Sequence, residues 1–132
     1  MTDTQTNPVS NDALALLARV LLATIFVLSG AAKLADPAGT AAYVASVGLP
    51  APQIAAWGAA LLEALGGLAL LTGYRARPAA LALAAFSVVA ALFFHNNFAD
   101  QNQMIHFMKN LAIAGGLLQL AITDPGRFAL AR

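Results

Sequence analysis

Three charged residues lie inside long apolar segments of this sequence, where charged side chains are rarely found. Arg19, Glu63 and Lys109 each interrupt a stretch that otherwise has the composition of a membrane-spanning helix. A charged side chain at the centre of a bilayer costs roughly 2.5–3.5 kcal/mol even on mild insertion scales. Such charges face the interior of a helix bundle, pair with one another or line a wet cavity. The three residues therefore form a candidate buried polar site.

Helix arithmetic gives the depth of each charge. Glu63 falls about midway along its segment, whereas Arg19 lies about 7 Å to one side and Lys109 roughly 6 Å to the other. An unpaired carboxylate at this depth would become protonated, so Glu63 is predicted to be ionised and paired with Arg19, Lys109 or both. Two interpretations stay open: an ion pair that fixes the helix register, or a polar site for a quinone head group or a proton.

A second group of polar residues lies near the ends of the apolar segments. Histidine can exchange protons near neutral pH, and amides and aromatic rings can bind a planar carbonyl compound. His106 and Asn110 are four residues apart and share a helix face. The alternative is an ordinary interfacial belt in which amides cap helix ends. The candidate outer-face site for a quinone or a proton consists of Lys33, His95, Asn96, His106 and Asn110.

Metal or haem ligation by the two histidines is a further possibility. His95 and His106 lie on separate predicted helices, but no third ligand is near them and the chain has no cysteine. Lys33 and Lys109 would also place positive charge beside such a site. We therefore predict no metal site.

The composition is that of an integral membrane protein. Of the 132 residues, 60% are hydrophobic and 10% are charged, whereas a soluble domain carries about 25% charged residues. A soluble fold of this size could not bury so much apolar surface. The formal net charge of +1 gives no indication of nucleic-acid binding, and the lack of cysteine excludes disulfides and thiol chemistry in this chain.

The apolar segments predict an all-α fold, a bundle of four transmembrane helices. Each segment is long enough, or nearly so, to cross roughly 30 Å of hydrocarbon at 1.5 Å per residue. A short interfacial helix is expected between the first two spans, beginning after the Asp36-Pro37 cap and covering Ala38 to Val47. The spans are predicted at about Ala13 to Leu34, Gln53 to Thr72, Pro78 to Phe94 and Met104 to Thr123.

Basic residues in the loops predict how the bundle is oriented. Arg75 and Arg77 lie between the second and third spans, and Arg127 and Arg132 follow the fourth. The positive-inside rule then places both termini in the cytoplasm of a bacterial inner membrane. The predicted regions are a polar cytoplasmic N-terminus (1–12), a four-helix membrane domain (13–123) and a basic cytoplasmic tail (124–132).

In their order and spacing, several short motifs together resemble the DoxX family of small bacterial four-helix membrane proteins. The resemblance extends from about Leu14 to Ile122. The matching elements are Arg19 followed by Ser29-Gly30-Ala31-Ala32-Lys33, then Val47-Gly48-Leu49-Pro50, Glu63-Ala64-Leu65-Gly66-Gly67 with Thr72-Gly73, Phe94-His95-Asn96, and Phe107-Met108-Lys109-Asn110-Leu111 leading to Gly115-Gly116.

The resemblance implies a redox-associated role, because the family name is linked to a membrane subunit of a thiosulfate:quinone oxidoreductase. The expected function is a quinone-linked accessory or membrane-anchor subunit of an oxidoreductase complex. No intrinsic cofactor is expected; the expected partners are a quinone, membrane lipid, a redox protein that supplies electrons, and a second copy of the chain. The alternative is a non-catalytic membrane assembly or interaction protein whose buried ion pair is structural.

Overall fold

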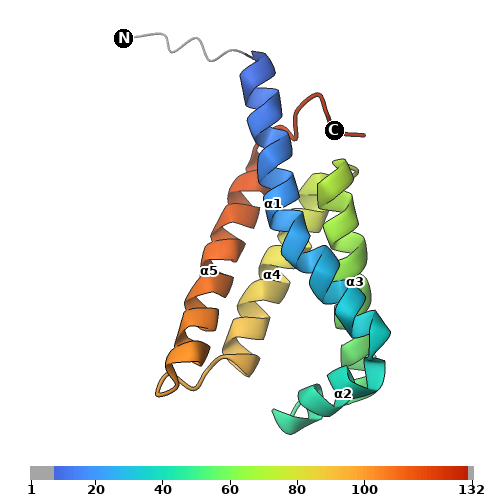
Figure 1. Cartoon of the computed structure of the whole chain (residues 1–132), viewed down its shortest axis with the longest axis vertical. Coiled ribbons are helices and arrows are strands. Elements are labelled where there is room, and N and C mark those ends of the chain that lie inside the picture. Colours follow the sequence, from blue (N-terminus) through green and yellow to red (C-terminus); the bar gives the residue numbers. More distant parts are fainter. Residues whose placement is uncertain (1–7, 131–132) are drawn as a thin grey trace.

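This computed structural model describes residues 8–130, which contain five α-helices joined by short loops (Figure 1). All except the second are long and apolar enough to cross a membrane. The predicted four-span bundle with a short helix between its first two spans is therefore confirmed. The helices are α1 (Pro8–Ala35), α2 (Pro37–Ser46), α3 (Pro52–Thr72), α4 (Ala76–Phe94) and α5 (Gln101–Ile122).

Local signals in the sequence set several of the helix ends. Asp36 is the N-cap of α2 and accepts a hydrogen bond from the Gly39 N–H at 3.0 Å. Gly73 adopts φ +76° and ends α3, its N–H donating to the Ala69 carbonyl at 2.9 Å. Asp100 is the N-cap of α5, and its side chain accepts a hydrogen bond from the Asn102 N–H at 2.9 Å.

The first helix differs from the prediction at its start. It begins at Pro8 rather than near Ala13, so part of the predicted polar N-terminus is helical. Proline suits the first turn of a helix because its missing N–H has no intrahelical partner there. Residues 1–7, the rest of that predicted region, and 131–132, which include Arg132, lie outside the described residues.

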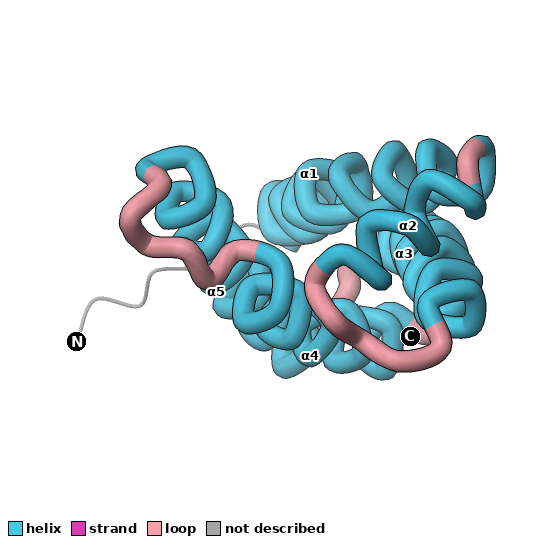
Figure 2. Tube along the Cα trace, turned by 90° about the horizontal axis from the view of Figure 1, so that it is seen from below, coloured by secondary structure: helices cyan, strands magenta, loops and turns pink. Residues whose placement is uncertain are grey.

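The helices pack as two pairs. α1 lies along α3 and α4 lies along α5, while α3 and α4 join the pairs and α2 packs on α3. Figure 2 views the molecule from the end that carries α2, with α1, α2 and α3 on one side, α5 on the other and α4 between them. We call this the α2 end. The opposite end carries the α3–α4 turn and the tail, residues 123–130, and we call it the tail end.

Close packing of α1 on α3 depends on two glycines. A Cβ atom at Gly30 would lie 2.5 Å from the backbone nitrogen of Ala64, and one at Gly67 would lie 2.9 Å from that of Val27. Only a residue without a side chain permits this approach of two backbones. The glycines thereby set the register in which α1 crosses α3.

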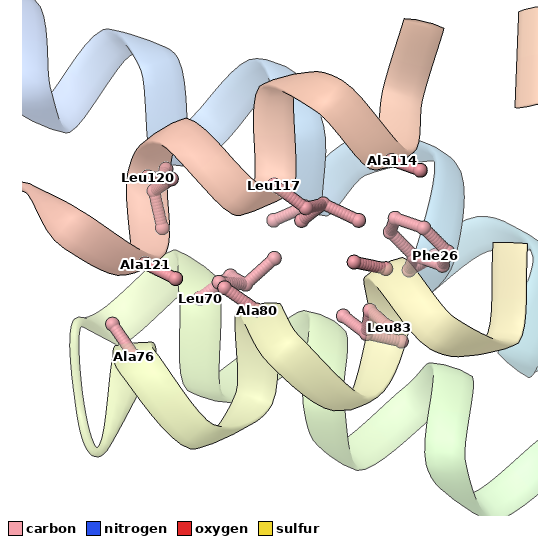
Figure 3. Packing of buried hydrophobic residues seen from close by; sticks show 11 residues of the cluster. Phe26, Leu70, Ala76, Ala80, Leu83, Ala114, Leu117, Leu120 and Ala121 are labelled. Atoms are coloured by element: carbon pink, nitrogen blue, oxygen red, sulfur yellow. The ribbon is translucent and has the colours of Figure 1, made fainter. Parts of the chain in front are cut away.

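A small apolar core joins the two pairs in the half of the bundle near the tail end (Figure 3). Most large apolar side chains instead point outward, as lipid-facing helices require. The core therefore consists mainly of alanine and a few leucines. Its members are Ala23, Phe26, Leu70, Ala76, Ala80, Leu83, Ala84, Ala114, Leu117, Leu120 and Ala121.

Candidate functional site

An ion pair between Lys33 and Glu63 is the centre of the candidate site. Lys33 Nζ lies 2.8 Å from Glu63 Oε2 and also donates a hydrogen bond to Ser29 Oγ at 2.7 Å. The Glu63 side chain is 6% exposed and that of Lys33 is 27% exposed. Lys33 and Ser29 are four residues apart on one face of α1, so this face presents a cation and a hydroxyl to α3.

The predicted partners of Glu63 are therefore wrong. Neither Arg19 nor Lys109 forms an ion pair with it among residues 8–130, and the Lys109 side chain is exposed. The predicted depths apply to upright helices, whereas α1 crosses α3 at Gly30. This crossing brings Lys33, one turn further along α1, beside Glu63.

Arg19 has a different role at the tail end. It is fully buried, and its guanidinium donates to four backbone carbonyls at 3.0–3.2 Å. Two of these carbonyls, Leu70 and Leu71, belong to the last turn of α3, where they have no intrahelical donor. The other two, Pro125 and Phe128, belong to the tail. Arg19 thus fastens the tail to α1 and to the end of α3.

A cavity of about 350 Å³ lies beside the ion pair towards the α2 end. All five helices contribute to its wall. Most of its surface is apolar, and Lys33, Glu63, His95 and Asn110 are among the polar residues that line it. These four were predicted site residues, so the structure brings together members of both predicted groups.

Aromatic rings form the end of the cavity beneath α2. The Tyr43 ring of α2 stacks on the Phe94 ring of α4, with centroids 5.1 Å apart, and both residues line the cavity. α2 packs by its backbone on α3 and α1 but not on α4. The ring pair therefore bridges α2 to α4 where their backbones are further apart.

A pair of imidazole rings connects the cavity to the surface. His95, the C-cap of α4, lines the cavity, and its ring centroid lies 5.1 Å from that of the exposed His106 on α5. Burial lowers the pKa of His95, and the nearby charge of His106 lowers it further. Within residues 8–130, no group of three or more His, Cys, Asp or Glu residues is placed to hold a metal ion.

The remaining members of the predicted outer-face site do not line the cavity. Asn96 is exposed and donates a hydrogen bond from Nδ2 to the Leu92 carbonyl at 3.1 Å. This bond gives a partner to a carbonyl in the last turn of α4. His106 reaches the cavity only through His95. The predicted cluster is therefore divided between the cavity wall and the surface.

The prediction missed several residues of the cavity. Ser29 is part of the family motif that ends at Lys33 but was not among the predicted site residues, yet its hydroxyl accepts a hydrogen bond from Lys33. Ser87 is buried in the cavity wall and donates to the Leu83 carbonyl at 2.8 Å. A single hydroxyl within the apolar α4 segment was the sequence signal that could have identified Ser87. Tyr43 and Phe86 gave no such signal, because aromatic residues are common both at membrane interfaces and in membrane helices.

This arrangement suits a small amphipathic molecule. The apolar wall accommodates a planar or hydrocarbon group, while the Lys33 ammonium and the Asn110 amide can donate hydrogen bonds to carbonyl oxygens. His95 can exchange a proton with such a group and with His106.

Comparison with known proteins places the chain among bacterial membrane proteins. The family model DoxX matches residues 14–96. The chain belongs to the DoxX family. It is 42% identical over 117 residues to the inner membrane protein YqjF of Escherichia coli strain K12, covering 89% of this chain and 88% of the relative. The chain is also 36% identical over 124 residues to YphA, another inner membrane protein of that strain. This alignment covers 90% of this chain and 89% of the relative.

No solved structure matches the chain significantly. The DoxX-family relatives and the four apolar helices together make this chain an integral inner membrane protein. The predicted membership of the DoxX family and the predicted location in a bacterial inner membrane are therefore confirmed.

Proposed function

We propose that this protein binds the head group of a membrane quinone and serves as the membrane subunit of an oxidoreductase complex. The observation that carries the proposal is the Lys33–Glu63 ion pair in the wall of a largely apolar cavity. Its volume of about 350 Å³ is within the range of roughly 300–1,000 Å³ found for ligand pockets.

The polar groups in the wall match the chemistry of quinone reduction. Reduction to the quinol adds two electrons and two protons, and both carbonyl oxygens become hydroxyls. Lys33 hydrogen-bonds one carbonyl oxygen, and His95 delivers the two protons in turn, each of which His106 takes up from solvent. The electrons come from a partner redox protein, because this chain has no cysteine for thiol or iron–sulfur chemistry.

The orientation of the bundle belongs to the same proposal. Arg75, Arg77 and Arg127 lie at the tail end, so the positive-inside rule puts this end in the cytoplasm and the cavity near the outer face. Fusions to the C-terminus test this orientation. Green fluorescent protein is expected to fluoresce there and alkaline phosphatase to be inactive; the reverse result would invert the orientation.

Quinone binding in nanodiscs tests the proposal directly. Purified wild type is expected to bind quinone saturably, and Glu63→Gln and Lys33→Met are expected to bind it at least about tenfold more weakly, or about 1.4 kcal/mol. Lys109→Met is the control, because this exposed lysine does not line the cavity. Circular dichroism confirms folding of each variant. Absence of binding by well-folded wild type would refute the proposal.

The second candidate function is a non-catalytic assembly or interaction protein. The observation in its favour is that the ion pair joins α1 to α3, as a structural pair would. In this case Glu63→Gln lowers yield and stability, while wild type binds no quinone. The same nanodisc experiment therefore separates the two functions.

A further inference from the structure

A second hollow lies between α1 and α5, nearer the tail end. It has a volume of about 420 Å³, and Leu22, Gly116 and Leu120 are among the residues that line it. α1 and α5 share few backbone contacts, and in Figure 1 they diverge towards the α2 end. The hollow therefore lies in the narrow part of a seam that widens towards the cavity.

The sequence positions show that the hollow and the cavity follow the same seam. On α1, the cavity residue Ile25 is three positions from Leu22 of the hollow. On α5, the cavity residue Ile113 is three positions from Gly116 of the hollow. Residues three or four apart lie on one helix face, one turn after another. The two spaces are thus consecutive along the facing sides of α1 and α5.

We propose that this seam holds the hydrocarbon tail of the lipid whose head group occupies the cavity, and that the lipid enters sideways between α1 and α5. The inference rests on the proposed function and adds to it the ligand class, a quinone with a long isoprenoid tail. The seam runs about 21 Å from Ser29 to Ala15 at 1.5 Å per residue, which accommodates several isoprene units.

The width of the seam favours a hydrocarbon tail over a helix from a second copy of the chain. A Cβ atom at Gly116 would lie only 3.5 Å from the Leu22 side chain, so the floor of the seam is narrow. A helix with its side chains is about 10–12 Å across. A single flexible tail needs much less room, and it continues directly from the head group in the cavity.

A matched pair of glycine variants tests the seam. Gly116 lines the hollow, whereas its neighbour Gly115 is exposed and a Cβ there would meet nothing within 4 Å. Gly116→Leu therefore fills the seam, and Gly115→Leu adds the same volume on the lipid-facing side. Both changes replace one glycine of α5 by leucine, so their effects on helix propensity are alike.

The probes are two ubiquinone homologues, one with a single isoprene unit and one with several. Lipid tails are as apolar as leucine, so the expected effect is steric rather than hydrophobic. Gly116→Leu is expected to weaken binding of the long-tailed homologue at least about tenfold, or about 1.4 kcal/mol, and to leave the short homologue within about twofold. Gly115→Leu is expected to leave both unchanged.

Each contrary outcome has a distinct meaning. If wild type binds both homologues and Gly116→Leu binds the long one normally, the tail does not lie in the seam and the inference is overturned, while the proposed function stands. If folded wild type binds neither, both fail together.

Should Gly116→Leu not fold, Leu22→Phe narrows the seam from α1. Its control is Leu17→Phe, because Leu17 is an exposed residue of the same helix that lines neither space.

Discussion

The Lys33 ammonium and the Glu63 carboxylate are 2.8 Å apart and connect α1 to α3 at the wall of the cavity. The two side chains are unequally buried: that of Glu63 is 6% exposed, and that of Lys33 is 27% exposed. The carboxylate therefore depends on its partner more than the ammonium does. This asymmetry makes the contributions of the two residues to stability separable.

Removing either partner of this ion pair is expected to destabilise the bundle, and Lys33→Met more than Glu63→Gln. Lys33→Met leaves a buried carboxylate unpaired, which costs about 3 kcal/mol. The double variant is expected to lie within about 1 kcal/mol of wild type, because a buried pair replaced as a whole loses little. The free energy of unfolding of each variant is measured by titration with SDS, followed by the helical circular dichroism signal. The four values form a double-mutant cycle. Additive effects of the two single changes would contradict the coupling.

Arg19→Met is expected to destabilise the tail end by about 3 kcal/mol, because it leaves carbonyls of α3 and the tail without donors. Arg19→Lys keeps the charge but not the fork of donors, so an intermediate loss is expected. Limited proteolysis of the tail measures its release directly. Wild-type resistance of the tail in Arg19→Met would show that other contacts hold it.

Gly30→Ala is expected to destabilise the bundle by about 1–3 kcal/mol, because its Cβ would meet the α3 backbone 2.5 Å away. Gly58→Ala is the control within α3: it is exposed and a Cβ there would meet nothing within 4 Å. This change is expected to stabilise the helix by about 0.5–1 kcal/mol. Thermal unfolding in micelles compares the two variants. The melting temperature is expected to fall in Gly30→Ala and to rise in Gly58→Ala.

Acidification is expected to destabilise the α2 end through His95. Burial lowers the pKa of this histidine below its usual 6.5, so the unfolded chain takes up the proton first as the pH falls. The free energy of unfolding is therefore unaffected by His95 above about pH 6.5 and falls as the pH is lowered below it. His95→Gln is expected to reduce this loss in pH-dependent melting curves. His106→Gln is expected to retain most of it, because burial is the larger cause.

The sequence predicted the helices and caps better than the contacts between helices. Apolar length determines a membrane span, and Asp36 and Gly73 act on backbone groups within a few residues, so such features follow from local chemistry. The crossing of α1 over α3 depends on Gly30 meeting Ala64, which is distant in the sequence. This crossing decides that Lys33 rather than Arg19 reaches Glu63.

The cavity was predictable in part. Its charged and imidazole groups were recognised because such groups are exceptional in apolar segments. Its aromatic wall was not, since Tyr43 meets Phe94 only through the placement of α2 across the bundle. The folding of the tail back onto Arg19 also had no local signal, because the bonded carbonyls belong to the backbone and are independent of residue type.

The contacts of Arg19 also constrain the order in which this protein can be completed during biosynthesis. Pro125 and Phe128 follow Arg19 by 106 and 109 residues, so the ribosome releases them after the other helices have been made. Until then the guanidinium in the first inserted helix lacks two of its four acceptors. The bundle therefore closes at this end only after Phe128 has left the ribosome, and a nascent chain that still lacks the tail retains an incompletely solvated cation in the membrane.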